Sequence, residues 1–344
     1  MDVRLSPEQQ ALRDSVAQVV ERLAPRAVGQ LDDLERIDKL DAAVAASGWR
    51  ELRASEDGGA PLASGVEVAI VAEQLGRGLV DAPFLGPTLA AELRRLAGAP
   101  AGPTAETVVL GPGLTELARV VEGGLPAGSV AIDAAGATSA LALAADGSSL
   151  VEVALVATGG EVDLTRPTAL PGPSSPAATD GQQRPLTADD LTAWAALGLA
   201  ATSADLVGAM HGAVDLACEY AAARRQYGSA IGSFQAVQHL LADAFVAMEG
   251  SRSVTIHAAW AVDALAPDDA LAAAAVAKAY CARAARTVCE TAIQVHGGIG
   301  NTWECMAHVY LRRVLLSSDV LGGAGTSLER VLHHHGLGGA HGLR

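Results

Sequence analysis

The sequence predicts a mainly α-helical protein with a small central β domain. Helix-spaced apolar positions fill its N-terminal and C-terminal parts, short β-compatible runs lie between them, and a Pro- and Ser-rich stretch follows those runs. We therefore expect an N-terminal helical domain over residues 1–105 and a small β domain over 106–170. A linker over 171–188 and a C-terminal helical bundle over 189–344 complete the chain.

The N-terminal region begins with a strong helix-start pattern. Ser6 suits the capping position, Pro7 the first helical position and Gln9 the capping-box position. Apolar residues then follow at helical spacing from Leu12 to Leu23. Further helical patterns, separated by glycines, occupy about residues 31–47, 64–77 and 86–97.

The central region has the pattern of a small β domain. Its β-compatible runs occupy residues 107–110, 129–132 and 150–156, with Gly, Pro and Asp between them. The stretch over 171–183 is rich in Pro and Ser and shows no periodicity, which is typical of a linker. A domain boundary is therefore expected there.

Long helices dominate the C-terminal region. Helical patterns occupy about 189–222, 234–265, 268–295, 303–317 and 325–334. Such long, Ala-rich helices predict an antiparallel four-helix bundle with faces that one subunit cannot cover, so we expect subunits to associate through it. Seven apolar residues of the second pattern are predicted to share one stripe: Phe234, Val237, Leu240, Leu241, Ala244, Phe245 and Met248.

Charge and composition exclude several classes of partner. The chain has 24 basic and 39 acidic residues, which give a net charge of −15. Its basic residues are scattered, so the sequence predicts no positively charged surface that could bind nucleic acid. The first residues lack the pattern of a secretory signal, and apolar stretches such as 193–204 are interrupted before the roughly twenty residues that a membrane span needs. We expect no nucleic-acid partner, no membrane span and a cytoplasmic location.

Neither the cysteines nor the histidines predict a metal site. The four cysteines form no CxxC pair and fall in helical patterns, so buried free thiols are expected instead of disulfides or zinc ligands. Residues 333–335 are three consecutive histidines, which we expect to be solvent-exposed. No bound metal is predicted.

Three segments of the C-terminal region resemble the signatures of acyl-CoA dehydrogenases. They read RRQYG over residues 224–228, FQAVQH over 234–239 and QVHGGIG over 294–300. The family pattern is an Arg-x-(Thr/Gln)-(Phe/Tyr)-Gly turn, a Gln eleven residues after the Arg, and a later Gln-x-x-Gly-Gly segment. All three occur here in order, and the three-part organisation matches as well. The glycines of the last segment follow a helix, not a strand, so they do not form a dinucleotide-binding fingerprint.

The resemblance implies that the bundle grips the ADP half of an FAD whose flavin ring lies in a neighbouring subunit. The arginine can give the pyrophosphate a forked, charge-assisted pair of hydrogen bonds, and the glutamines add polar contacts without charge. The tyrosine offers a flat face, and glycines let the backbone approach the ligand. The residues implied to bind the cofactor are Arg224, Gln226, Tyr227, Gln235, Gln294, Gly297 and Gly298.

The catalytic base of the family has no counterpart in this sequence. The reaction needs a glutamate that removes the α-proton while the β-hydride passes to the flavin. Many members carry it before a Gly-Thr-Ser triplet, where Ala324 stands here, and others carry it on the helix that precedes the arginine turn, where Gly198 stands. We therefore predict no catalytic residue on this chain. Three other C-terminal glutamates lie off the family's positions and are interpreted as ordinary helix charges: Glu290, Glu304 and Glu329. We predict that neither these three nor Glu249 acts as the base.

The β domain also departs from the family pattern. Members hold the flavin ring with a Thr/Ser-Glu-Pro-x-x-Gly-Ser-Asp turn and a Trp-Ile-(Thr/Ser) strand. The nearest match, residues 125–129, lacks the Glu and the Asp, and residues 106–170 contain no tryptophan. We expect a degenerate ring pocket.

A chain with the ADP-binding residues but no base resembles the shorter, degenerate subunit of heteromeric α2β2 acyl-CoA dehydrogenases of sterol-degrading bacteria. The resemblance implies an FAD-dependent oxidoreductase of lipid metabolism that introduces an α,β double bond into a bulky acyl-CoA, such as a steroid side-chain thioester. A partner subunit would supply the glutamate and the ring site, and an electron-transfer acceptor would reoxidise the flavin.

Two alternatives remain open from the sequence. One is a self-sufficient homo-oligomeric dehydrogenase whose base is displaced, for instance to Glu304 or Glu249. The other is a non-catalytic scaffold that binds no flavin. The joint presence of the arginine and glutamine signature residues argues against the scaffold.

Overall fold

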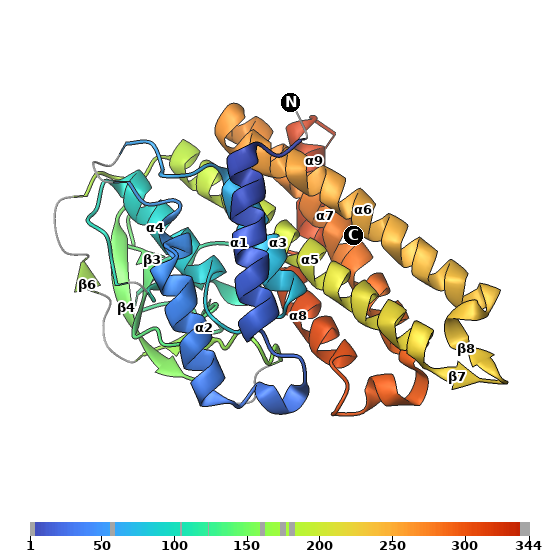
Figure 1. The fold of residues 1–344 in the computed structure, drawn as a ribbon. Helices are drawn as coiled ribbons and strands as arrows, with labels where there is room; N and C mark the ends of the chain where they lie inside the picture. Colours follow the sequence, from blue (N-terminus) through green and yellow to red (C-terminus); the bar gives the residue numbers. More distant parts are fainter. Residues whose placement is uncertain are drawn as a thin grey trace.

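The computed structural model describes residues 4–55, 59–103, 105–122, 124–158, 162–172, 177–178 and 183–337. Within them the predicted fold class is confirmed: helices open the chain, a small sheet follows and long helices close it. Figure 1 shows β3, β4 and β6 at one side of the molecule and the long helices α5, α6 and α7 side by side at the other.

The N-terminal helices begin and end close to the predicted residues. The capping box of the first helix is formed, because Gln9 N–H donates to Ser6 Oγ (3.2 Å) and Ser6 N–H donates to Gln9 Oε1 (3.0 Å). The third helix packs between α1 and α5. The elements are α1 (Pro7–Leu23), η1 (Val28–Gln30), α2 (Leu34–Ala46), η2 (Trp49–Glu51), α3 (Gly65–Arg77) and α4 (Leu85–Ala97).

The central strands form one sheet in the order β3-β1-β2-β5-β4-β6, and β3 also pairs with β4, so five strands close on themselves. All pairs are antiparallel except β1–β3. The three predicted runs are strands, although β2 is shorter than expected, whereas β3, β5 and β6 were not predicted. The strands are β1 (Thr107–Leu110), β2 (Val130–Ala131), β3 (Ser139–Leu143), β4 (Leu150–Ala157), β5 (Ala169–Pro171) and β6 (Ala177–Ala178).

Long helices form the C-terminal region, and a short hairpin separates the first two of them. The expected patterns are all found, and α5 is the central helix, packed against α3, α6, α7 and α8. The elements are α5 (Ala188–Ala223), β7 (Arg225–Gln226), β8 (Ser229–Ala230), η4 (Ile231–Ser233), α6 (Gln235–Ala264), α7 (Pro267–His296), η5 (Gly297–Asn301), α8 (Ala307–Asp319) and α9 (Ala324–His334).

By length and composition α5 could cross a membrane, but 89% of its most apolar window is buried inside the protein, as in a core helix. The predicted domain boundaries stay a prediction. Part of the expected linker, residues 173–176 and 179–182, lies outside the described residues. One hydrophobic core joins residues from all three regions, such as Val16, Leu141 and Trp194.

The predicted single stripe on α6 is wrong in part. Ala244 and Met248 are buried, with Val237 and Leu241 partly buried beside them, because these four recur at three- and four-residue spacing. The other three predicted members lie off that face and are exposed: Phe234 at 38%, Leu240 at 40% and Phe245 at 50%.

The cysteine prediction also needs one correction. Cys281, Cys289 and Cys305 are buried free thiols, as expected, but Cys218 is exposed. It lies near the end of α5, where the helix leaves the core.

A buried charge cluster joins the sheet region to the bundle. Asp205 of α5 accepts hydrogen bonds from Arg313 Nε (3.0 Å) and from the Ser317 hydroxyl (2.6 Å), both on α8. Arg166, from the segment between β4 and β5, lies 3.4 Å from the same carboxylate and pairs with Asp163 (3.0 Å). Burial alone would raise the pKa of Asp205, but the two guanidinium charges lower it to about 2.

Lys278 of α7 lies beside this cluster and is fully buried. Its ammonium donates to the Ser317 carbonyl, in the last turn of α8. Loss of hydration lowers the pKa of Lys278 from 10.5 to about 7. The folded chain therefore binds this proton less tightly than the unfolded chain does.

We predict that Lys278 makes stability depend on pH. Between pH of about 7 and 10.5 the unfolded chain carries more protons at this residue, so the unfolding free energy rises with pH, by up to about 1.4 kcal/mol per unit. Lys278→Met should flatten this rise in urea unfolding measured across that window, whereas Lys39→Met, at an exposed lysine, should not. Parallel profiles for Lys278→Met and the native chain would contradict the assignment.

Candidate functional site

Three chain segments meet at one end of the bundle. Because α5, α6 and α7 follow one another in antiparallel order, the end of α5, the start of α6 and the end of α7 lie together, and the β7–β8 hairpin projects there (Figure 1). A ring contact links two of them: Tyr220 of α5 stacks on His296 of α7 with centroids 4.4 Å apart. The three signature segments of the sequence therefore share one end of the molecule.

The hairpin exposes its polar and aromatic side chains. Arg224 caps α5, with its N–H donating to the Tyr220 carbonyl (2.8 Å), and its guanidinium has no partner among the described residues. Gln226 donates to the neighbouring carbonyl of Arg225 (2.8 Å). An exposed, unpaired guanidinium can form two parallel hydrogen bonds to a phosphate at little desolvation cost.

The hairpin turn is tight and unusual. Tyr227 and Gly228 both have positive φ, 50° and 81°, as a two-residue primed turn requires. Glycine accepts this conformation readily, but tyrosine adopts it at a cost. The Tyr227 side chain is 94% exposed, and its ring makes an edge-to-face pair with Phe234, with centroids 6.3 Å apart. The chain thus holds a large aromatic face out into solvent.

The remaining predicted residues lie on the start of α6 and the end of α7. Gln235 is the first residue of α6 and Gln294 lies in the last turn of α7, and both are exposed. Gly297 has φ +64° and ψ −140°, which side chains rarely allow. Gly298 has no positive φ, and a Cβ there would meet nothing within 4 Å among the described residues. Nothing in the described chain therefore requires glycine at 298, whereas a closely approaching ligand would.

The two positions where the family carries its base hold no acid. Gly198 is buried on α5, and a Cβ there would lie 2.2 Å from Leu321 Cδ1 and 3.4 Å from Leu89 Cδ2. Ala324 is the first residue of α9 and is half-buried. The space beside Gly198 is thus filled by leucine, and a glutamate would not fit there without repacking.

Four of the C-terminal glutamates occupy ordinary positions: Glu249, Glu290, Glu304 and Glu329. Glu249 pairs with Arg252, Glu290 with Arg286 (2.8 Å), and Glu329 is exposed on α9. Glu304 is exposed, and hydrogen bonds from its own backbone and from Thr302 lower the pKa of its carboxyl. It does line an open hollow of about 470 Å³, together with Leu164 and Trp303 among others.

The Ser129 turn, the nearest match to the family's ring-binding turn, is closed on itself. The Ser129 hydroxyl donates to the Pro126 carbonyl at 2.7 Å, so it is already used within the turn. This agrees with a degenerate ring pocket.

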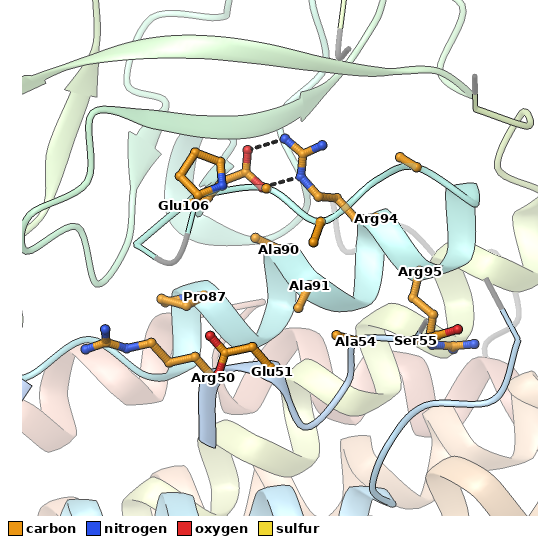
Figure 2. A pocket seen from close by; sticks show the side chains of 14 residues that line it. Arg50, Glu51, Ala54, Ser55, Pro87, Ala90, Ala91, Arg94, Arg95 and Glu106 are labelled. Carbon is orange, nitrogen blue, oxygen red and sulfur yellow. Dashed lines mark hydrogen bonds and ion pairs between the residues drawn. The ribbon is translucent and has the colours of Figure 1, made fainter. Parts of the chain in front are cut away.

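A separate hollow of about 80 Å³ lies between η2, α4 and the segment that leads to β1 (Figure 2). Most of its charged side chains are already paired, although Glu51 Oε2 has no hydrogen-bond partner among the described residues. Arg94 binds Glu106 (Nη2–Oε1 2.6 Å) and Glu152 (2.7 Å), and Arg95 binds Glu92 (2.7 Å). Burial raises the pKa of Glu106, against the effect of Arg94. We interpret this hollow as structural, since it is far smaller than typical ligand pockets.

Sequence reasoning missed the stacked pair at the bundle end. Tyr220 and His296 adjoin the signature segments, but their contact depends on how α5 and α7 pack. Helical spacing alone gives no signal for it.

Comparison with known proteins matches these observations. Residues 195–333 match the family model described as "Acyl-CoA dehydrogenase, C-terminal domain". The chain is 30% identical to acyl-CoA dehydrogenase IpdE2 of Mycolicibacterium smegmatis over 344 residues, covering 95% of this chain and 98% of that protein. It is 34% identical to the IpdE2 of Mycobacterium tuberculosis over 274 residues, with 77% and 76% covered.

Solved structures share the fold. The ChsE4-ChsE5 complex from Mycobacterium tuberculosis gives a TM-score of 0.79 at 24% identity, covering 98% of this chain and 99% of that chain. A variant of the Tcur3481-Tcur3483 steroid acyl-CoA dehydrogenase gives 0.77 at 24% identity, with 97% and 99% covered. With the near full-length relative at 30% identity, these findings lead to one conclusion: the chain belongs to the acyl-CoA dehydrogenase family.

Proposed function

We propose that this chain is the shorter, non-catalytic subunit of an FAD-dependent heteromeric acyl-CoA dehydrogenase. It would hold the ADP half of the cofactor, while a partner subunit in an α2β2 heterotetramer supplies the catalytic glutamate and the ring site. The bound FAD would accept the β-hydride as the partner's glutamate removes the α-proton. The observation that carries the proposal is the exposed Arg224, whose guanidinium has no partner among the described residues, at the same end of the bundle as the Gly297–Gly298 turn.

The exposed residues at the bundle end fit a pyrophosphate. Arg224 can donate both N–H groups of one guanidinium edge to phosphate oxygens. Gln235 and Gln294 can donate from the start of α6 and the end of α7, and Gly298 leaves room for the ligand at the backbone. Together they would hold a polar anion at a surface that another subunit covers.

The bundle also exposes apolar surface of the kind that subunit interfaces bury. Leu240, Phe245 and Val246 of α6 are 40%, 50% and 68% exposed, and Tyr280 of α7 is 45% exposed, with its hydroxyl next to Gly250 of α6. Large exposed apolar side chains on adjacent helices favour a protein partner. Two similar structures are named for paired proteins, ChsE4-ChsE5 and Tcur3481-Tcur3483.

The proposed substrate class rests on those relatives. Tcur3481-Tcur3483 is described as a steroid acyl-CoA dehydrogenase. We therefore propose a steroid side-chain CoA thioester as substrate and a role in steroid degradation, in the cytoplasm. An electron-transfer acceptor would reoxidise the flavin. A self-sufficient enzyme is the second candidate, and it is favoured only by the position of Glu304 at an open hollow.

Arg224→Ala tests the cofactor role directly. Loss of one charge-assisted contact, about 1.5–3 kcal/mol, should weaken FAD binding by the assembled complex roughly 10- to 150-fold. Fluorescence titration of the apo complex with FAD measures this. The fold should stay intact, because Arg224 is exposed and its side chain has no partner among the described residues.

The matched control is Arg225→Ala, which removes the neighbouring exposed arginine of the same hairpin. It should leave FAD affinity within a few-fold. Arg224→Lys should recover only part of the affinity, because lysine keeps the charge and loses the fork. Native FAD affinity in Arg224→Ala would refute the transfer of this motif.

A second set of variants tests the absence of a base. Each glutamate-to-glutamine change should leave turnover of the complex within a few-fold, whereas loss of a true general base costs about 10²–10⁴-fold. Steady-state turnover with flavin content measured in parallel gives the answer. A collapse of that size in one variant, with flavin bound and the complex intact, would establish the self-sufficient enzyme. The variants are Glu249→Gln, Glu290→Gln, Glu304→Gln and Glu329→Gln.

A further inference from the structure

The two halves of the proposed ADP site belong to helices that are far apart in sequence. Arg224 follows the last turn of α5, and Gly297 and Gly298 follow the last turn of α7. Such a site binds tightly only if the distance between its two halves is fixed. If that distance varies, ordering the site on binding costs free energy and lowers the affinity for the ligand.

One ring contact links the last turns of these two helices. Tyr220 lies four residues before Arg224, and its carbonyl accepts the Arg224 N–H at 2.8 Å. His296 immediately precedes Gly297. The rings stack with centroids 4.4 Å apart and planes 23° from parallel. The stack therefore connects Tyr220, which is hydrogen-bonded to Arg224, with His296, which directly precedes the Gly297–Gly298 turn.

His296 is itself held in place. It is 7% exposed, and its Nδ1 lies 2.7 Å from the Ala292 carbonyl, which can only accept, so Nδ1 carries the proton. Next to it, Gly297 has φ +64°, so the chain direction changes directly after the fixed ring. Because His296 is buried, it would act on a ligand only through the turn that follows it.

We propose that the Tyr220–His296 stack is a positioning pair that sets the distance between Arg224 and the Gly297–Gly298 turn. This inference rests on the proposed function. It adds a specificity element: the pair lets the complex use the ADP half of FAD, and riboflavin, which has neither the pyrophosphate nor the adenosine, gains nothing from it. Loosening the stack should weaken FAD binding and leave riboflavin binding unchanged.

The test compares FAD and riboflavin affinities of the apo heteromeric complex by fluorescence titration. His296→Ala, which removes one ring, should weaken FAD binding about 2- to 12-fold, the range of one aromatic pair. Riboflavin affinity should not change. His296→Phe restores a flat ring without the Nδ1–H bond and should recover most of the FAD affinity, as should Tyr220→Phe from the other side.

A double-variant cycle separates positioning from general damage. If the rings act as one unit, Tyr220→Leu combined with His296→Ala should be no weaker for FAD than the weaker single variant. Additive losses, equal losses for FAD and riboflavin, or no loss in His296→Ala would overturn the inference. If His296→Ala does not assemble, the comparison of Tyr220→Leu with Tyr220→Phe decides by the same criteria.

Arg224→Ala in the same assay tells the two proposals apart. If it weakens FAD binding while the folded ring variants do not, the positioning role is wrong and the cofactor role stands. If neither Arg224→Ala nor the ring variants weaken FAD binding, the cofactor role itself is wrong.

Discussion

The burial of Asp205 in the middle of α5 constrains the rest of the structure. An ionised carboxylate in the core is tolerated only when it is fully paired, and here Arg313, Arg166 and Ser317 surround it. Arg313 and Ser317 lie on α8, and Arg166 lies in the sheet region. The Asp205 carboxylate therefore holds α5 in place against both α8 and the sheet region. The position of α5 in turn fixes Gly198, towards its start, and Arg224 at its end.

Gly198, towards the start of α5, and Arg224, at its end, distinguish this chain from a complete enzyme of the family in different ways. At Gly198, one of the two positions where the family carries its base, Leu321 and Leu89 fill the space that a side chain would need. At the other end, α5 passes into a hairpin whose Tyr227 has positive φ, and Arg224 is exposed there with no side-chain partner among the described residues. One part of α5 thus lacks room for the family's base, and its end exposes an arginine that can contact a ligand. This combination fits a subunit that completes a partner's cofactor site.

The sequence could predict what local rules decide. The α1 capping box and the helix spacings follow from neighbouring residues, so these elements were predicted correctly. Strand β3, Ser-Ala-Leu-Ala-Leu, has no β-branched residue and is a strand because it pairs with β1 and β4. The exposure of Phe245 and the Tyr220–His296 stack likewise depend on which helices pack together, which spacing does not encode. The signature residues themselves were found by their order and spacing, but their cofactor contacts stay a prediction.

The most direct test of the account is the visible absorption spectrum of the purified chain, alone and copurified with its partner subunit. Flavin bound to the complex but not to the chain alone is the predicted result, since this chain would hold only the ADP half. A yellow chain that turns over acyl-CoA without a partner would contradict it and show a self-sufficient enzyme. A complex without flavin would contradict it as well, because the bundle end would then bind no cofactor.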